Sequence, residues 1–410
     1  MIHDGIPIVN VTFAKGTALR VLRAIRCGTF ADAHARLNLA NRMSLIDPDP
    51  FPRQKWSKKS LSLSRFGLED RADKDHPIDV VVSSKDKRLR VPYVRNVVYG
   101  ETRQMPRNSF VPVAEGVAIS SPELLFVEMG ETMSLAEHLL LGMELCGRFS
   151  RHPDDWRNGK GKLKIAPVTC VANIETFMAS AKWLHGIARA RTTLRLLAEN
   201  AWSPTEATVA AMAVLPLGEF GYGLGKCELN PRVTPSDEAL ARTMVRGSRV
   251  PDIVFKGSTV GINYDGVVHL DLEGIAKAGV EAGLHPEVRA TQMALDKVVR
   301  DVRAKAIDDI RRNRELMANG YTVFPVTKED LYDEGGLDKV MLQVIEALER
   351  TSGADLSRQR ELLDVPFAKN QRQRLIWSLL PGSRETRISS DLGLRYADDP
   401  SAIYEVLIGF

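Results

Sequence analysis

PDIVFKGSTVGINYDG, residues 251–266, is the stretch that decides the fold of the second half of this chain. Two runs of β-forming residues flank Gly257 and Ser258, and a two-residue loop that begins with glycine favours a type II′ turn in a tight hairpin. Such a turn places Asp252 directly opposite Asn263. Cross-strand neighbours in this position lie about 5 Å apart at Cβ.

The alternation of side chains along the hairpin separates an apolar face from a polar one. Val260 and Ile262 point to one face, whereas Asn263 and Asp265 point to the other, which Asp252 shares. Acidic groups crowded on one face repel each other unless a cation offsets their charge, so the pattern predicts a divalent metal. A half-exposed hairpin whose polar face meets water is the other interpretation.

The segments around the hairpin predict an α/β sandwich. Ser203 and Glu206 open an apolar helix, in which Glu206 is either an additional metal ligand or half of a capping box. A helix over residues 284–319 and a strand over 321–327 follow, and a hairpin, a long helix and a returning strand make such a sandwich. His269 is either a metal ligand or general base, or a structural histidine.

The first half of the chain reads as mixed α and β structure. Strands are expected over residues 6–12, 79–83 and 90–99, and a helix begins near Gly16. Ser121 followed by Pro122 is typical of a helix start, and residues 170–200 form a further helical block. Polar residues 45–77 predict a long loop or linker.

The composition indicates a globular protein but does not indicate its activity. The chain has 410 residues, 44% hydrophobic and 26% charged, which is the usual globular mixture and predicts two domains. A net charge of +4 is too small to argue for nucleic acid by itself. The four cysteines form no metal-binding pair in sequence. With no leader or membrane-spanning pattern, we expect a cytoplasmic protein with no membrane partner.

One segment is much more basic than the whole chain. Residues 51–107 contain fourteen Lys or Arg against seven Asp or Glu. Its positive charges form two clusters, which include Lys58 and Lys59 in one and Lys87 and Arg88 in the other. Positive side chains in this number can contact successive phosphates of a nucleic acid backbone. Arg312 on the long helix is a further candidate for phosphate contact. An ordinary solvated surface explains the same charges.

Several motifs occur in one order in the second half: SPTEATVAAMAVLPL, CELNPRV, PDIVF, VGINYDGVVH, then Asp309 with Arg312, then GYTVFPVT. Over residues 200–345 this set resembles an uncharacterised bacterial family of the PD-(D/E)XK type, related to very-short-patch repair endonucleases. The resemblance implies a restriction-endonuclease-like fold and a Mg²⁺ or Mn²⁺ site.

The same resemblance assigns roles to particular residues. It matches the family's motif residues to Glu206, Asp252, Asp265, His269 and the pair Asp309 and Arg312. For a metal-dependent nuclease we expect Asp252, Asp265 and Glu206 to hold the metal, and Asn263 to orient the attacking water or complete the metal shell. His269 would transfer a proton or support a metal ligand, and Asp309 with Arg312 would brace the long helix. Asn263 stands where the family has glutamate. A neutral amide supplies one oxygen and no charge, so metal affinity is expected to fall.

The first half is similar to proteins related to AbiEi-type antitoxins, through GTALRVLRAIR and ISSPELLFVEMG. We therefore expect three regions. Residues 1–199 form an α+β domain for DNA or partner binding, 200–350 the nuclease-like domain and 351–410 an extension. The expected function is metal-dependent cleavage of DNA, weakened by Asn263, in a defence or toxin–antitoxin context. The alternative is a catalytically inactive DNA-binding regulator that keeps the fold, and a protein partner or a homo-oligomer stays open.

Overall fold

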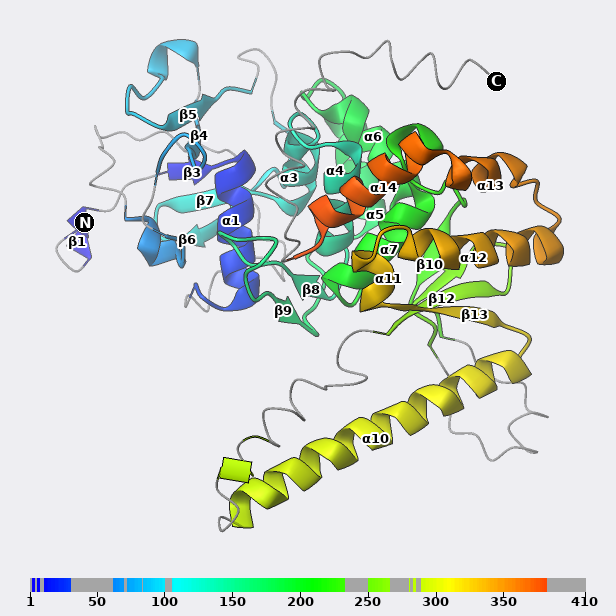
Figure 1. Ribbon diagram of the computed structural model, residues 1–410. Coiled ribbons are helices and arrows are strands. Elements are labelled where there is room, and N and C mark those ends of the chain that lie inside the picture. The colour runs from blue at the N-terminus through cyan, green and yellow to red at the C-terminus, as the bar shows by residue number, and fades with distance from the viewer. Residues whose placement is uncertain are drawn as a thin grey trace. The chain divides into compact units, whose positions relative to one another are not determined.

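The computed structural model describes residues 2–3, 6–7, 11–30, 62–69, 72–82, 84–99, 105–232, 250–265, 280, 283–284 and 289–381 (Figure 1). The chain divides into two compact units. Unit 1 lies within Met1–Ala211 and Leu379–Gly382, and unit 2 lies within Met212–Ser378. Both contain helices and a mixed sheet, so the fold class is mixed α/β.

A five-stranded sheet forms the centre of unit 1, in the order β5-β4-β3-β7-β6. Its strands are β3 (Val11–Phe13), β4 (Ile78–Val81), β5 (Val94–Val97), β6 (Phe110–Ala114) and β7 (Val117–Ser120). β3 pairs with β7 in parallel and with β4 antiparallel. The strands expected near residues 79–83 and 90–99 are β4 and β5, whereas β6 and β7 were not anticipated.

Helix α1 (Lys15–Cys27) follows β3 directly and packs against the sheet. Its apolar residues, including Leu19, Leu22 and Ile25, are buried, as helical spacing predicts. The helix ends at Gly28, whose φ of 87° is left-handed and whose N–H donates to the Ala24 carbonyl. The helix expected near Gly16 is therefore confirmed.

Among the described residues, four further α-helices lie entirely within unit 1. They are α3 (Pro122–Met129), α4 (Leu135–Leu145), α5 (Val171–Ser180) and α6 (Ile187–Leu196). Ser121 caps α3, since its hydroxyl accepts the Leu124 N–H at 3.3 Å. The remaining short elements are β1 (Ile2–His3), β2 (Ile6–Pro7), η2 (Leu63–Phe66), η3 (Lys85–Lys87), β8 (Phe149–Ser150) and β9 (Lys162–Leu163).

His138 is buried inside α4 and makes the stability of unit 1 depend on pH. Its ring nitrogens lie 2.6 Å from the Phe126 carbonyl and 2.8 Å from the Thr193 hydroxyl. Burial lowers the pKa of His138 to about 4. As pH falls, the unfolded chain therefore takes up a proton first, and stability declines between about pH 6.5 and 4 by up to about 1.4 kcal/mol per pH unit.

Replacing His138 with glutamine, which does not titrate, is expected to remove that part of the acid sensitivity. Urea unfolding at pH 7 and at pH 5 measures the effect. The wild-type protein should lose more stability than the variant between the two values. An equal loss in both proteins would contradict a neutral buried histidine.

A four-stranded mixed sheet forms the centre of unit 2, in the order β10-β11-β12-β13. The strands are β10 (Cys227–Leu229), β11 (Ile253–Phe255), β12 (Val260–Asp265) and β13 (Thr322–Thr327). β10, β11 and β12 are antiparallel neighbours, and β13 runs parallel to β12. The strand expected over residues 321–327 is β13, and Pro325 fits its position in an edge strand.

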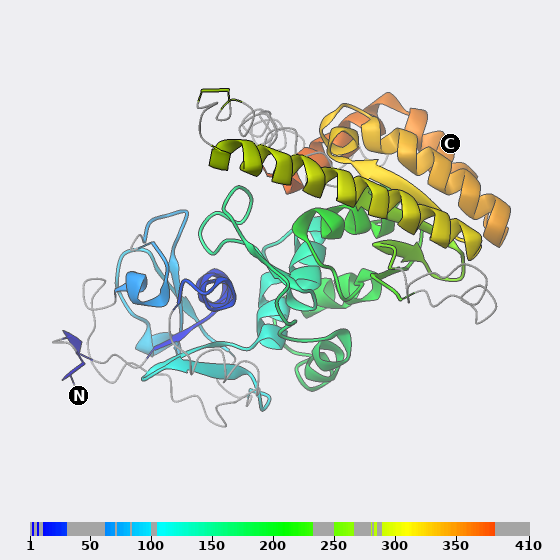
Figure 2. The ribbon, with the colours of Figure 1, turned by 90° about the horizontal axis from the view of Figure 1, so that it is seen from below.

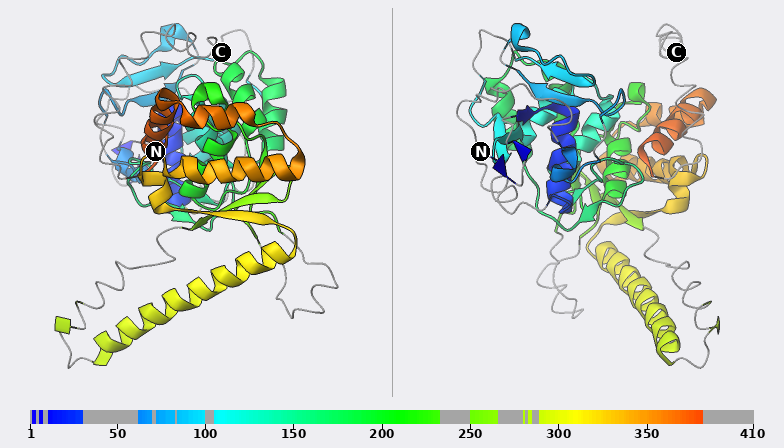
Figure 3. Two further views of the ribbon diagram at one scale, coloured as in Figure 1. Left: turned by 45° about the vertical axis from the view of Figure 1, so that its right-hand side comes forward. Right: turned by 90° about the vertical axis from the view of Figure 1, so that its left-hand side faces the viewer.

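Helices of unit 2 lie on both faces of this sheet. α12 (Gly336–Ser352) contacts β12 and β13, and α10 (Arg289–Ala318) contacts β13. Figure 3 shows α10 and α12 on opposite sides of the strands, and in Figure 2 α10 crosses in front of β13. The described part of the long helix, residues 289–318, lies within the range expected for it and is followed by Gly320 with a φ of 80°.

The other helices are α7 (Pro204–Val214), η4 (Leu217–Glu219), α11 (Lys328–Tyr332), α13 (Ser357–Asp364) and α14 (Pro366–Leu379). A buried ion pair ties α14 to α12, because Arg372 donates from Nε and Nη2 to Asp338 at 2.6 and 3.1 Å. The Tyr222 hydroxyl donates to the same carboxylate at 2.7 Å. Among the helices described here, none has the length and apolar character to cross a membrane.

Candidate functional site

The hairpin of β11 and β12 has the predicted register. Ile253 pairs with Ile262 and Val254 with Gly261, so the next pair outward is Asp252 with Asn263. A hydrogen bond joins these two residues directly, since the Asp252 N–H donates to Asn263 Oδ1 at 3.1 Å. The prediction that they lie side by side is confirmed.

The turn itself differs from the predicted one. The Ser258 N–H donates to the Phe255 carbonyl at 3.2 Å, which places Lys256 and Gly257 at the turn centre. Gly257 has a φ of 79°, as the third position of a type II turn requires. The prediction of a two-residue turn at Gly257 and Ser258 is therefore wrong. Residues 256–259 connect the strands instead. The connection is longer than predicted by one residue on each side, so the pairing of the two strands is unchanged.

The Asp252 carboxylate is held by the backbone of the neighbouring strand. Its Oδ2 accepts the Tyr264 N–H at 2.6 Å. The Asp252 carbonyl accepts the Asn230 N–H at 2.9 Å on the other side. Asn230 has a left-handed φ of 51°, which asparagine tolerates better than most residues. Asn230 directly after β10, Asp252 directly before β11 and Asn263 within β12 thus lie in one row across the sheet.

On the polar face of the hairpin, Asn263 is buried and contacts α10. Asn263 is only 1% exposed, and its Nδ2 donates to Asn313 Oδ1 on α10 at 3.2 Å. The interpretation of a polar face that meets water is therefore wrong at Asn263. Asn313 was missed in the sequence. Asparagine is a poor helix former, so its place inside a long helix was the available signal of a tertiary contact.

This arrangement supplies oxygen atoms of the kind that Mg²⁺ prefers. In the part of unit 2 that is described, Asp252 provides a carboxylate, and Asn263 provides an amide oxygen that already accepts an N–H. Asp265 ends β12 opposite Thr327, and its side chain lies outside the description. His269 also lies outside the described residues. Over the described ranges, no group of three or more His, Cys, Asp or Glu forms a metal cluster.

Glu206 lies in unit 1, in the first turn of α7, whereas Asp252 belongs to unit 2. Its N–H donates to the Ser203 hydroxyl at 3.2 Å, which is half of the expected capping box. Its carboxylate accepts the Trp202 N–H at 3.2 and 3.3 Å, one residue before the cap. The structure thus gives Glu206 a role at the start of α7.

The candidate phosphate contacts are only partly described. Lys87 and Arg88 are exposed at the end of η3. Lys58 and Lys59 lie outside the described residues. Arg312 is half-buried on α10, next to Asn313, whereas the side chain of Asp309 is not described. Lys87 and Arg88 therefore remain accessible to a polyanion.

Comparisons of this chain with protein-family models, with curated proteins and with solved structures found no match.

Proposed function

We propose that unit 2 is a nuclease-type domain of the PD-(D/E)XK kind that acts on DNA, with Asp252 as its principal metal ligand. The observation that carries the proposal is the hydrogen bond between Asp252, directly before β11, and Asn263 within β12. The mixed sheet, with β13 returning parallel to β12 after a long helix, supports it. Mg²⁺ or Mn²⁺, when bound there, would polarise a phosphodiester and lower the pKa of a water.

The residues of this chain hold the site in shape. The Tyr264 N–H fixes one oxygen of Asp252, so this carboxylate needs little ordering when a cation arrives. Asn263 fixes the Asp252 backbone and also binds α10 through Asn313. Asn263 is thus a positioning residue, and Asp265 would supply the second carboxylate. Because Asn263 carries no charge, the proposed activity is weaker than that of a site with glutamate there.

A second candidate function is DNA binding without cleavage, as in an antitoxin-like regulator. One observation favours it: both polar atoms of the Asn263 amide are used in internal hydrogen bonds. Such a network stabilises a scaffold whether or not a metal binds. The exposed Lys87 and Arg88 fit contact with phosphates in either case.

Two assays on the full chain separate the candidates. The nuclease proposal expects supercoiled plasmid to be cut with Mg²⁺ or Mn²⁺ and to stay intact in EDTA. Binding without cleavage predicts retention of DNA in EDTA, with affinity that falls steeply as salt rises. Intact plasmid together with salt-dependent binding would favour the second candidate. No binding at low salt and no cutting would contradict both.

Changing Asn263 to glutamate tests whether the missing charge limits the site. Glutamate next to Asp252 should raise Mn²⁺ affinity at least tenfold and speed cleavage. Without metal it should lower the melting temperature, because a buried second carboxylate then lies beside Asp252. Asn263→Gln is the matched control, since it has the same length and no charge.

Isothermal titration with Mn²⁺ and melting with and without Mn²⁺ measure both effects. If the glutamate and glutamine variants bind Mn²⁺ equally, the residue at position 263 does not tune a metal site.

A further inference from the structure

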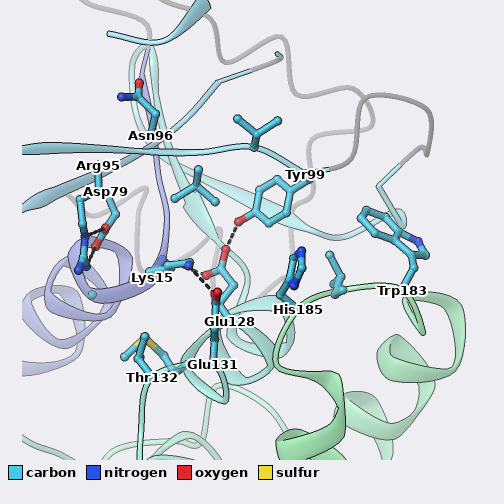
Figure 4. A pocket seen from close by; sticks show the side chains of 15 residues that line it. Lys15, Asp79, Arg95, Asn96, Tyr99, Glu128, Glu131, Thr132, Trp183 and His185 are labelled. Atoms are coloured by element: carbon cyan, nitrogen blue, oxygen red, sulfur yellow. Dashed lines mark hydrogen bonds and ion pairs between the residues drawn. The ribbon is translucent and has the colours of Figure 1, made fainter. Parts of the chain in front are cut away.

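Unit 1 contains a cavity of about 590 Å³. It lies among the start of α1, strands β4 and β5, the end of α3 and the loop at residues 183–185. Figure 4 shows Glu128 in the middle of the lining residues, with Tyr99, His185 and Lys15 around it and Trp183 at one side. Cavities of about 300–1,000 Å³ are the usual size for small-molecule sites.

Glu128 is the central polar group of this cavity and is only 4% exposed. Its Oε2 accepts the Lys15 N–H at 2.9 Å, and its Oε1 accepts the Ser120 hydroxyl at 3.0 Å and the Tyr99 hydroxyl. These described partners are an amide and two hydroxyls, all electrically neutral groups. Burial of a carboxylate whose described hydrogen-bond partners carry no charge is costly.

The other charged groups of the lining are matched to each other. Lys15 Nζ lies 2.6 Å from Glu131. Arg95 donates to both oxygens of Asp79, at 2.6 and 3.0 Å. These two pairs balance, so ionisation of Glu128 gives the described lining one net negative charge.

Burial raises the pKa of Glu128 to about 8, although the Lys15 N–H and the Lys15 charge oppose the shift. The carboxyl therefore keeps its proton at neutral pH until a positive charge enters the cavity. The titratable or charged groups that line the cavity from the neighbouring elements are Lys15 of α1, Asp79 of β4, Arg95 of β5, Tyr99, Glu131 and His185.

We propose that this cavity binds a small organic cation, with Glu128 as its counter-ion and Tyr99 and Trp183 as aromatic walls. A planar amidinium or amine fits the volume and supplies the positive charge that the lining lacks. Aromatic faces attract such cations further. The site belongs to unit 1 and does not depend on the nuclease proposal for unit 2.

Three probes of one shape and different charge test the ligand class on the full chain. Benzamidine is a cation, benzamide is neutral and benzoate is an anion. Calorimetric titration should show benzamidine binding at least tenfold more tightly than benzamide, and benzoate more weakly than either. Equal binding of the three probes, a preference for benzoate, or no binding of benzamidine would overturn the proposal.

Proton release tests the role of Glu128. At pH 7, binding of benzamidine should release close to one proton, which titrations in buffers of different ionisation enthalpy reveal. Affinity should rise about tenfold per pH unit towards pH 8 and level off above it. Affinity that does not change over this range would contradict Glu128 as the counter-ion.

The Glu128→Gln variant should bind benzamidine at least tenfold more weakly than the wild type and should release no proton on binding. This variant resembles the protonated side chain, so its folding is checked by circular dichroism at pH 6. Glu175→Gln is the matched control, because Glu175 is an exposed carboxylate of α5 outside the cavity, and it should change binding less than threefold. Unchanged binding of benzamidine in the Glu128→Gln variant would refute the assignment.

The Trp183→Leu variant tests the aromatic wall. It should bind benzamidine more weakly than the wild type but still release the proton on binding.

Discussion

Replacing Asp252 with alanine is expected to lower metal-dependent cleavage of DNA at least 100-fold. The variant loses the carboxylate that, in our proposal, holds the cation. It also loses the acceptor for the Tyr264 N–H, which costs about 1 kcal/mol because Asp252 is only half-buried. The sheet should therefore stay folded, and the loss should reflect chemistry, not unfolding.

A matched pair of variants separates charge from hydrogen bonding. Asp252→Asn keeps an oxygen that can accept the Tyr264 N–H but removes the charge, and it should be as inactive as alanine. Glu228→Gln removes an exposed carboxylate of β10, and it should cut like the wild type. Plasmid nicking rates with Mn²⁺ are the measurement. Equal rates in the wild type and both Asp252 variants would refute the enzymatic proposal.

Replacing Glu144 with alanine is expected to destabilise unit 1 by about 3–5 kcal/mol. Glu144 is 1% exposed and accepts from Arg23 Nε and Nη2 at 3.0 and 2.7 Å. It also accepts the Arg151 N–H at 2.9 Å. Burial alone would raise the pKa of Glu144, but the charge of Arg23 holds it below its ordinary value. Alanine leaves Arg23 buried without this carboxylate.

Chemical denaturation at pH 7 measures this loss, with the exposed Glu175→Ala as the control. The depressed pKa means that the contribution of Glu144 is present above the ordinary glutamate pKa and is lost as pH falls through the folded value. The Glu144→Leu/Arg23→Met double variant should recover part of the stability, because Arg23 is then no longer left buried without its carboxylate. A loss below about 1 kcal/mol for Glu144→Ala would contradict a tightly coupled pair.

The hairpin of unit 2 could be predicted because its determinants are local. Apolar alternation and a glycine between two short strands define the register within 16 residues, and an error of one residue in the turn centre did not change it. Position 252 could therefore be placed beside 263. The burial of Asn263 could not be predicted, because its partner Asn313 is 50 positions away. Their contact depends on how α10 packs against the sheet.

The contacts at the centre of unit 1 could not be predicted from the sequence either, because they too join residues that are far apart in the chain. Lys15 and Glu128 are 113 positions apart, and Thr17 and Asp79 are 62 positions apart. Each looks like an ordinary surface or cap residue by itself. Only the pairing of β3 with β4 and β7 brings them together, and no local pattern specifies that pairing.

Anomalous diffraction from crystals of the full chain soaked in Mn²⁺ tests most directly whether Asp252 belongs to a metal site. The proposal predicts an anomalous peak within coordination distance of the Asp252 carboxylate, on the Asp265 side of the hairpin, that disappears in Asp252→Asn crystals. A soaked crystal with no peak at Asp252, or the same peak in the Asp252→Asn crystals, would contradict it.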